Sequence, residues 1–218
     1  MNGTEAGIQE KSYLSIFADR PVPEELITKS IKAALHAPAY NHLWEWGFIR
    51  INQADDRLAL VDSLDLHDWW DREKLRRAFA HLPQEARKVY MGACPVQRTM
   101  MVRAPELIVV VYRTKRMENS ARSPVDLNAH AAIWMAISYF LLSLAEDGLF
   151  SCTVPPGPTA KAKDLLDIPN EWEIAVLLPI GYPRFTPKRH AHPTDPSPFI
   201  HEDKFRGFSL PTTEKQMG

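Results

Sequence analysis

The sequence predicts a single-domain α+β protein, and three observations support this fold class. The chain has 218 residues, enough to bury one substantial core without requiring a second domain. Apolar residues make up 45% and charged residues 24%, the composition of an ordinary soluble globular protein. Helical and strand patterns alternate irregularly, which favours an α+β layered arrangement over a doubly wound parallel sheet.

Composition also narrows the possible partners. The formal net charge is −1, which predicts no nucleic-acid partner and no binding to an anionic membrane. Cys94 and Cys152 form no metal-type pair, and free thiols suit a cytoplasmic location. The opening MNGTEAGIQEK has no apolar signal core, so secretion is not expected. The histidines near the carboxyl end match no metal-ligand spacing, so no metal site is expected.

The first half of the chain is predicted to be mainly helical. Residues 8–17 have mixed polarity and suit a short helix. The run at 21–38, PVPEELITKSIKAALHAP, places a proline and two acids in its first turn, spaces its apolar residues at helical intervals and stops at Pro38. GFIRI, at 47–51, alternates like a short strand, and residues 54–103 have mostly helical patterns.

Three later segments have strand or helix patterns of their own. PELIVVVYR, at 105–113, and EIAVLLPIGYP, at 173–183, are β-branched or apolar runs bounded by proline, so both are predicted to be buried strands. LFSCTVPP, at 149–156, is predicted to be a strand entering a turn, followed by a short helix at 159–166. Residues 184–218 contain several prolines and little periodicity, so this arm is predicted to be disordered or laid along another surface.

The most apolar segment is AAIWMAISYFLLSLA, at 131–145. It is shorter than the roughly 20 residues that a membrane span requires. Asp126 or Asn128 can cap its start, and Gly148 can end it. A helix that is apolar on nearly every face must be covered on nearly every face. We therefore predict the core helix of a homodimer, with a core helix inside one chain as the alternative.

Several catalytic signatures are missing or ambiguous. The chain has only nine glycines and contains no phosphate-binding loop of the G-x-G-x-x-G or G-x-x-x-x-G-K-[ST] type. The nucleophile elbow G-x-S-x-G is also missing, so a serine hydrolase is not supported. Cys152 is a possible nucleophile, but a cysteine between Ser151 and Thr153 on an apolar strand is favoured as a small core residue.

Four segments, taken in order, resemble the FMN-dependent nitroreductase family. The first is the A-P-x-x-x-H-L-x-x-W-x-F pattern at 37–48, and the second is VQRTMMVRAPELIVVV at 96–111. The third is the helix and turn at 128–151, and the fourth is LLDIPNEWEIAVLLPIGYP at 165–183. The first segment is similar to the branch of the family whose loop has an H-L-R-x-W pattern. The resemblance extends from about residue 11 to residue 190.

The resemblance implies a nitroreductase-like fold. Such a fold has a central, mainly antiparallel sheet flanked by helices, and it forms a homodimer with two flavin sites at the subunit interface and extended terminal arms around the partner. Residues 1–218 would then form one domain, with a helical insert or lid at about 54–103 and a C-terminal arm at 184–218.

The resemblance also assigns contacts to the cofactor, FMN. In the family, an N-terminal arm grips the phosphate and ribityl chain, and a second basic group clamps the phosphate after the Gly-Tyr-Pro turn. A turn after the third strand places its backbone against flavin N5 and O4, and the loop after Ala-Pro forms a wall beside the flavin. The matching residues are Lys11, Ser12, Tyr13 and Ser15 in the arm; Lys188 and Arg189 in the clamp; Val154, Pro155, Pro156 and Gly157 in the turn; and His42 and Trp44 in the loop.

The departures from the family pattern have chemical consequences. Lys11 keeps one cation of the arm, but Ser12 and Ser15 replace basic residues, and Trp44 stands where relatives often carry Lys or Arg. Reduced flavin is negatively charged around N1 and O2, and a nearby cation raises its reduction potential. The sequence therefore predicts a flavin of low potential or an altered pocket.

The function implied by the resemblance is an FMN-dependent oxidoreductase. Hydride would pass from NADH or NADPH to flavin N5 and then to a small, aromatic or conjugated acceptor. His42 and Tyr40 are the candidate catalytic residues, as proton donors or substrate contacts. Two alternatives remain open: a specialised dehydrogenase or oxidase acting on a natural product, and a flavin-binding subunit with little turnover of its own.

Overall fold

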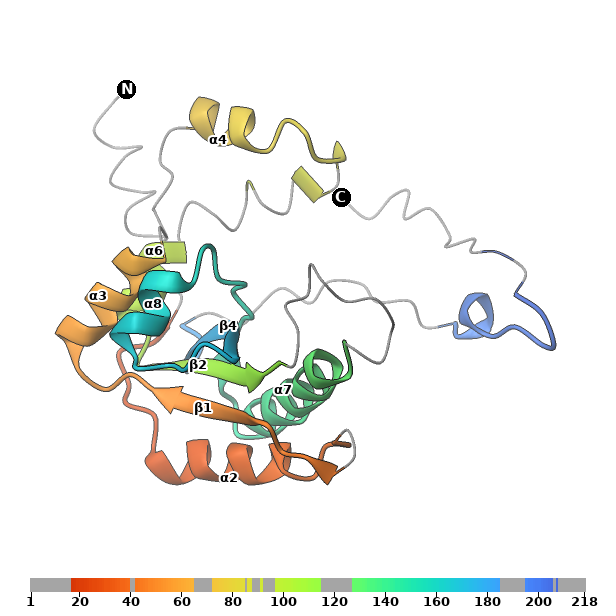
Figure 1. Ribbon diagram of the computed structural model, residues 1–218, viewed down its shortest axis with the longest axis horizontal. Coiled ribbons are helices and arrows are strands. Elements are labelled where there is room, and N and C mark those ends of the chain that lie inside the picture. Colours follow the sequence, from red (N-terminus) through yellow and green to blue (C-terminus); the bar gives the residue numbers. More distant parts are fainter. Residues whose placement is uncertain are drawn as a thin grey trace. The chain divides into compact units, whose positions relative to one another are not determined.

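The computed structural model describes residues 17–39, 42–64, 72–84, 86–87, 91, 97–114, 127–184, 195–205 and 207. The chain divides into two compact units, residues 1–185 and 186–218. The first unit contains the sheet and the described α-helices (Figure 1). In the second unit, the short 3-10 helix η5 (Ser197–Phe199) follows Asp195, whose carboxylate accepts hydrogen bonds from the backbone N–H and the hydroxyl of Ser197.

The first unit is built on a four-stranded antiparallel sheet. Its order is β1 (Trp46–Arg50), β2 (Glu106–Arg113), β4 (Trp172–Gly181) and β3 (Phe150–Ser151). Both predicted buried strands are confirmed, because every residue of β2 from Leu107 to Tyr112 is buried, as is all of β4 from Ile174 onward. Each long strand is apolar on both sides because helices cover both faces of the sheet.

The predicted strand at 149–156 is only partly regular. β3 comprises two residues, and Val154 then forms a single bridge with Leu177 of β4. Pro155 and Pro156 follow at once, and a proline lacks the backbone N–H that a continuing ladder would need. Regular pairing therefore ends at Ser151, and the last bridge to β4, at Val154, comes just before the prolines.

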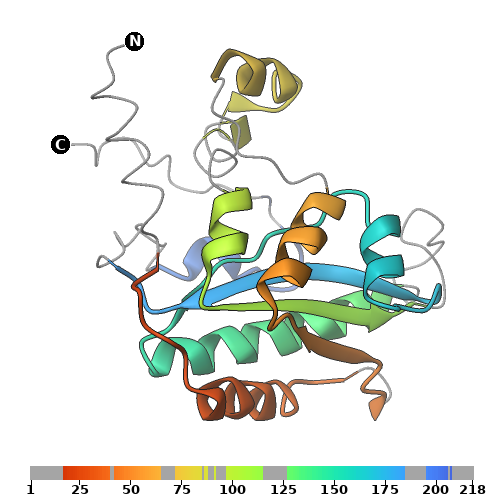
Figure 2. The same ribbon diagram turned by 90° about the vertical axis from the view of Figure 1, so that its left-hand side faces the viewer.

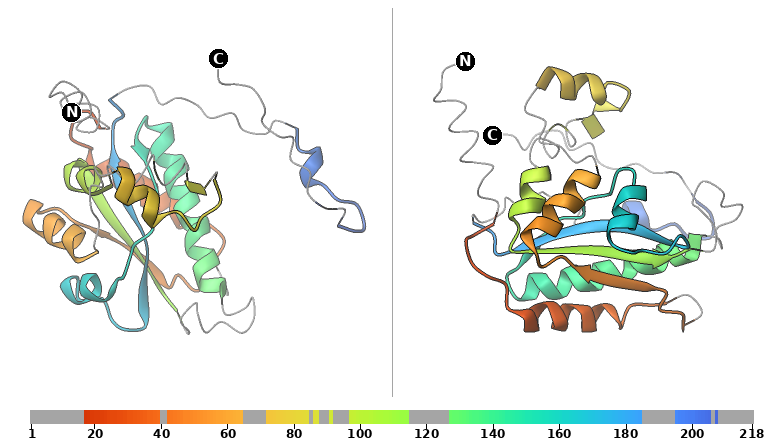
Figure 3. Two further views of the ribbon diagram at one scale, coloured as in Figure 1. Left: turned by 90° about the horizontal axis from the view of Figure 1, so that it is seen from above. Right: turned by 60° about the vertical axis from the view of Figure 1, so that its left-hand side comes forward.

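The helices lie in two layers, one on each face of the sheet (Figures 2 and 3). One core contains residues of α2 (Glu24–Ala34) and α7 (Asn128–Glu146) against one face. The other core contains residues of α3 (Ala54–Ser63), α6 (Gln97–Arg103) and α8 (Ala160–Leu165) against the opposite face. A further helix, α4 (Arg72–Ala78), follows α3 in the chain. This layered arrangement confirms the predicted α+β class.

α2 packs along α7 and fixes its position on the sheet. Pro23 and two acidic residues stand at its start, as predicted, and it buries Ile27, Ser30 and Ala34. The Ser30 hydroxyl lies 3.3 Å from that of Ser143 on α7, a polar contact inside the core. At the surface, Lys29 Nζ lies 2.9 Å from the carboxylate of Asp147, just after α7.

Backbone hydrogen bonds cap the end of α7, whereas no side chain caps its start. The N-cap residue is Leu127 and no side chain caps the helix there, so the predicted capping by Asn128 is wrong; Asp126 lies outside the described residues. Asn128 is instead the first helical residue. Gly148 has φ of +72°, and Leu149 N–H donates to Leu144 O at 3.0 Å, so the predicted glycine stop is confirmed.

α7 is covered on one side only within the single chain. The side containing Ile133, Ala136 and Phe140 is fully buried against α2 and the sheet. The opposite side exposes Tyr139 (43%) and Leu142 (68%). Within the part of the chain that the structure describes, α7 is the one helix long and apolar enough to cross a membrane by length and composition. Its packing is that of a core helix with one apolar side left open.

Candidate functional site

The N-terminal segment meets the sheet at the end of β4. Phe17 forms an antiparallel bridge with Pro183, and Ala18 N–H donates to Tyr182 O at 2.8 Å. In an antiparallel pair, the residues before one partner and after the other leave in the same direction. The chain before Phe17 and the chain after Pro183 therefore leave the sheet at the same point.

Phe17 and Pro183 are described residues that lie close in sequence to the two predicted phosphate clamps. Lys11, Ser12, Tyr13 and Ser15 lie outside the described residues, as do Lys188 and Arg189. Phe17 and Pro183 therefore pair at one corner of the sheet, although they lie far apart in the sequence.

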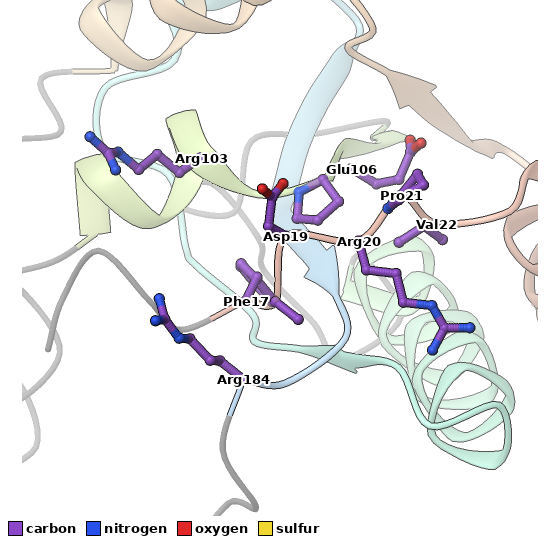
Figure 4. Close-up of a pocket in the computed structure, with 10 residues that line it drawn as sticks. Phe17, Asp19, Arg20, Pro21, Val22, Arg103, Glu106 and Arg184 are labelled. Carbon is purple, nitrogen blue, oxygen red and sulfur yellow. The ribbon is translucent and has the colours of Figure 1, made fainter. Parts of the chain in front are cut away.

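A cavity of about 620 Å³ opens at the same corner (Figure 4). Five of its lining residues are charged: Asp19, Arg20, Arg103, Glu106 and Arg184. The guanidinium of Arg20 lies 3.7 Å from the centre of the Tyr182 ring, a cation–π contact. Sequence reasoning did not select Arg103 or Arg184. Arg184 directly follows the Gly-Tyr-Pro turn, and this position was the signal that could have identified it.

The turn after β3 offers little free backbone to a ligand. The N–H and C=O of Val154 both bond to Leu177, at 3.0 and 2.9 Å, and Pro155 and Pro156 have no N–H. Gly157 therefore carries the remaining backbone donor of the predicted turn. A Cβ atom at Gly157 would lie 3.1 Å from Leu64 O, so glycine allows this close approach to the end of α3.

The aromatic loop is held firmly at its base and exposed at its tip. His42 has φ of +56°, a left-handed conformation that is uncommon for a residue with a side chain. Trp44 is 53% exposed, whereas Trp46 is half-buried, with its ring 5.6 Å from that of Phe48. Trp46 therefore packs against the core at the start of β1. Tyr40 lies outside the described residues.

Two interactions fix the base of this loop to β2. Arg113 N–H donates to Glu45 O at 2.8 Å, and the Arg113 guanidinium donates to the Glu45 carboxylate at 3.3 Å. A small crevice beside them is lined by Leu43, Trp46 and Ala129. The loop therefore presents Trp44 outward from a rigid support.

A polar chain behind the loop joins α7 to β2. Trp134 Nε1–H donates to His130 Nε2 at 2.9 Å, and His130 Nδ1 lies 3.3 Å from the Tyr112 hydroxyl. Because an indole N–H can only donate, this arrangement places the ring hydrogen of His130 on Nδ1. The sequence pattern did not single out these residues, because the helix was interpreted as apolar on nearly every face.

The two sets of predicted flavin contacts lie on opposite edges of the sheet within one chain. Trp46 begins β1, an edge strand, and packs on the face covered by α2 and α7. Val154 continues the opposite edge and packs on the face covered by α3, α6 and α8. Three strand spacings separate the edges, a lateral distance of roughly 14 Å. One chain therefore does not bring its aromatic loop and its 154–157 turn together.

The surroundings of the Cys152 thiol do not suit a catalytic nucleophile. Its thiol is half-buried with Sγ 3.6 Å from Met100 Sδ, and burial raises its pKa from 9.0 to about 11. A thiol with such a pKa is almost entirely protonated at neutral pH, and the thiolate is the reactive form. The interpretation of Cys152 as a core residue therefore agrees with its surroundings.

This pKa leads to a testable expectation. Between about pH 9 and 11 the unfolded chain ionises Cys152 while the folded chain keeps it protonated, so the free energy of unfolding falls as pH rises through this window. Cys152→Ala should remove this component of the pH dependence while leaving flavin content unchanged. Urea unfolding at a series of alkaline pH values measures the difference between the two proteins. A parallel pH dependence in both would contradict the assignment.

Comparison with known proteins identifies the family. The model of the nitroreductase family matches residues 14–182, most of the chain. The chain belongs to the nitroreductase family. This membership confirms the predicted family, the α+β fold and the predicted enzyme class, an FMN-dependent oxidoreductase. The match begins within the N-terminal arm and ends in the Gly-Tyr-Pro turn.

Two curated proteins are similar to most of this chain. Iodotyrosine deiodinase from Thermotoga neapolitana is 26% identical over 165 residues, which cover 76% of this chain and 80% of that protein. Iodotyrosine deiodinase 1 from Rattus norvegicus is 23% identical over 179 residues; these cover 81% of this chain but only 60% of the rat protein. This chain therefore spans less than two thirds of the rat relative.

Solved structures show the same fold. Oxidized iodotyrosine deiodinase bound to FMN and 3-iodo-L-tyrosine superposes with a TM-score of 0.66 at 19% identity, covering 87% of this chain and 92% of that one. The NADPH:FMN oxidoreductase from Vibrio harveyi complexed with NAD+ gives a TM-score of 0.60 at 16% identity, covering 89% of this chain and 75% of that one.

A metal centre finds no support in the described ranges. None of the His, Cys, Asp or Glu side chains described there form a group of three or more able to hold a metal ion. His201 is among them, and its ring packs against that of Phe205 at 4.7 Å.

Proposed function

We propose that this chain forms a homodimer whose two FMN sites each combine the aromatic loop of one subunit with the 154–157 turn and basic arms of the other. In each site, electrons would pass from NADH or NADPH through the flavin to a small aromatic or conjugated acceptor, in the cytoplasm. The observation that carries this proposal is the separation of the two sets of contacts on opposite edges of the sheet. A second subunit can supply what one chain cannot bring together.

The exposed side of α7 supports a second copy of the chain as the partner. Met135, Tyr139 and Leu142 are 39%, 43% and 68% exposed and recur at i, i+4 and i+7. This spacing forms one apolar stripe along the helix. A twofold interface uses the same patch on both subunits, so two such stripes can cover each other.

The described residues fit FMN in two respects. The N–H of Gly157 is the remaining backbone donor of the 154–157 turn, because Val154 bonds to Leu177 and the two prolines have no N–H. Trp44 offers a large flat surface at the tip of a rigid loop, suited to a position beside an aromatic cofactor. When bound, FMN supplies the acceptance and donation of hydride at N5.

The protein itself would position the reactants and manage protons. Trp44 from one subunit and Gly157 from the other would confine the ring and exclude water from one side. His42 and Tyr40, from the same loop, are the candidate proton donors to the acceptor. Lys11, Lys188 and Arg189 would hold the phosphate through charge-assisted hydrogen bonds.

The relatives favour a phenolic acceptor as a more specific version of this function. The curated relatives named above are iodotyrosine deiodinases, and one structural neighbour holds 3-iodo-L-tyrosine beside FMN. The corresponding reaction would replace an aromatic carbon–halogen bond by carbon–hydrogen, using two electrons from the flavin and one proton and releasing halide. Halide release from 3-iodo-L-tyrosine by the reduced protein would support this version, and nitroarene reduction alone would support the general one.

An absorbance spectrum of the purified protein tests the proposal first. A yellow protein that bleaches with NADH or NADPH supports it. A yellow protein that ignores both donors but converts a substrate with oxygen would indicate a specialised dehydrogenase or oxidase instead. A protein that binds FMN but turns nothing over would be a flavin-binding subunit. A colourless protein that cannot be reconstituted with FMN contradicts the proposal.

Arg189→Ala tests the predicted clamp. A guanidinium can grip phosphate oxygens with two donors, so its loss should weaken FMN retention by on the order of tenfold or more while the dimer stays folded. Flavin release on dilution, followed by the recovery of free FMN fluorescence, measures the effect. Unchanged retention would show that the phosphate lies elsewhere.

A further inference from the structure

The base of the aromatic loop, at Glu45 and Trp46, is held from both faces of the sheet. Arg113 N–H donates to Glu45 O at 2.8 Å, and the two side chains pair on one face. Trp46 and Tyr112, the next partners in the register, form a non-hydrogen-bonded pair of this antiparallel ladder. In such a pair the Cβ atoms lie only about 5 Å apart, so the two side chains stand next to each other on the face covered by α2 and α7.

Tyr112 connects this cross-strand pair to the first turns of α7. Its hydroxyl lies 3.3 Å from His130 Nδ1, and the two rings meet edge to face with their centres 5.4 Å apart. His130 Nε2 accepts a hydrogen bond from Trp134 Nε1 at 2.9 Å. Because the indole can only donate, the imidazole must turn its bare nitrogen to Trp134 and its N–H to Tyr112. The two contacts together fix one tautomer and one orientation of the His130 ring.

The same end of α7 also contacts the loop directly. Leu43, Trp46 and Ala129 line one crevice, and Ala129 immediately precedes His130. Tyr112 is buried and His130 is half-buried, and losing a hydrogen-bond partner inside a protein costs free energy. Trp44, which is exposed, lies only two residues before Trp46. The direction in which Trp44 leaves the sheet therefore depends on how firmly Trp46 is held.

We propose that His130 is a positioning residue of the proposed flavin site. It holds Tyr112 against Trp46, and thereby fixes the position from which the loop presents Trp44 to the flavin ring. This inference rests on the proposed function, in which Trp44 confines that ring. His130 acts through Tyr112 and Trp46 and itself touches neither the flavin nor the acceptor.

A purely structural role for the same contacts predicts a different result. No side chain caps the start of α7, and His130 lies in its first turn, so the polar chain would then serve only to anchor this end of the helix. In that case, removing the Tyr112 hydroxyl would lower the free energy of unfolding. It would not loosen the loop more than other losses of stability do, and it would not alter the surroundings of the flavin.

Tyr112→Phe removes the hydroxyl but keeps the ring beside Trp46. Backbone hydrogen exchange of the full-length protein, measured by mass spectrometry on a peptide covering residues 42–48, reports local opening of the loop before FMN is added. We expect this peptide to exchange roughly fivefold faster in the variant, the factor that corresponds to losing one internal hydrogen bond. The readout does not depend on whether FMN binds.

A second measurement is made after FMN is added. The visible circular dichroism of a bound flavin reports the asymmetric surroundings of its ring, so it changes when a flanking side chain moves. We expect Tyr112→Phe to change this signal in the same direction as Trp44→Ala does. A dichroism spectrum identical to that of wild type would contradict the proposed effect on Trp44.

Ser30→Ala is the matched control. The Ser30 hydroxyl is buried and lies 3.3 Å from that of Ser143 on α7, the same distance as the contact between Tyr112 and His130. Its loss should lower the free energy of unfolding in urea by an amount similar to that in Tyr112→Phe. The exchange of the 42–48 peptide and the dichroism of FMN should both remain as in wild type.

His130→Phe tests the same contact from the other partner, because it keeps an aromatic ring but has no nitrogen. The double variant Tyr112→Phe/His130→Phe should open the loop less than the sum of the two single effects, since both remove one shared contact. Fully additive effects would overturn the inference, as would a loop peptide that exchanges equally in Tyr112→Phe and Ser30→Ala. Wild-type protein that binds no FMN would overturn the proposed function, and the exchange measurement would still decide whether His130 positions the loop.

Discussion

Leu142→Glu is expected to convert the protein into monomers that no longer retain FMN. Leu142 is the most exposed residue of the apolar stripe on α7, and the twofold interface would bury it twice. Losing a buried leucine costs about 2 kcal/mol for each copy, so the dimer dissociation constant should rise by roughly a thousandfold. Size-exclusion chromatography with light scattering measures the mass, and the visible spectrum measures the flavin content.

Leu58→Glu is the control for this substitution. Leu58 is 39% exposed on α3, on the opposite face of the sheet from α7. The Leu58→Glu substitution introduces the same charge at an exposed leucine. We expect the protein to remain dimeric and to keep its flavin. A Leu142→Glu protein that remains dimeric and yellow would refute the proposal that α7 forms the dimer interface.

The shared site can also be tested by mixing two defective proteins. Trp44→Ala removes a contact of the aromatic loop, and Arg189→Ala removes one of the basic arm. If each site combines these elements from different subunits, a mixed dimer contains one doubly defective and one intact site. An equal mixture in which subunits exchange freely should then recover about a quarter of the intact sites. No recovery would place both contacts in one subunit.

Gly181→Ala is expected both to destabilise the fold and to weaken FMN retention. An added Cβ would lie 2.8 Å from Phe17 Cδ1 and 2.8 Å from Pro105 Cδ, too close for either atom to remain in place. Overpacking of this kind typically costs about 1–3 kcal/mol. Phe17 must move, and with it the base of the N-terminal arm. Urea unfolding and flavin release on dilution measure the two effects.

Gly148→Ala separates the loss of stability from the loss of binding. Gly148 also resists substitution, because its φ of +72° is unfavourable for alanine, but no atom lies within 4 Å of a Cβ there. Its replacement should cost about 1 kcal/mol while sparing FMN. If both variants lost flavin in proportion to their stability, Gly181 would have no specific role in placing the arm.

The elements predicted most accurately are those whose pattern is local and strong. β2 and β4 are long apolar runs bounded by proline, and α2 and α7 combine periodic apolar residues with start or stop signals. The strand after α7 was predicted too long because apolar residues continue to Val154, whereas regular pairing is limited to β3, with one further bridge at Val154 before the two prolines. Backbone hydrogen bonding, and not hydrophobicity, decided that boundary.

The amino-acid sequence by itself determined the family, the fold class and the identity of the candidate loop, turn and arms, because each depends on residues that are neighbours in the chain. Only the tertiary structure decided that the loop and the turn occupy opposite edges of the sheet, and that Phe17, Arg103 and Arg184 line one cavity. The physical reason is that strand order and helix packing set distances between residues far apart in the chain. No local pattern of side chains encodes those distances.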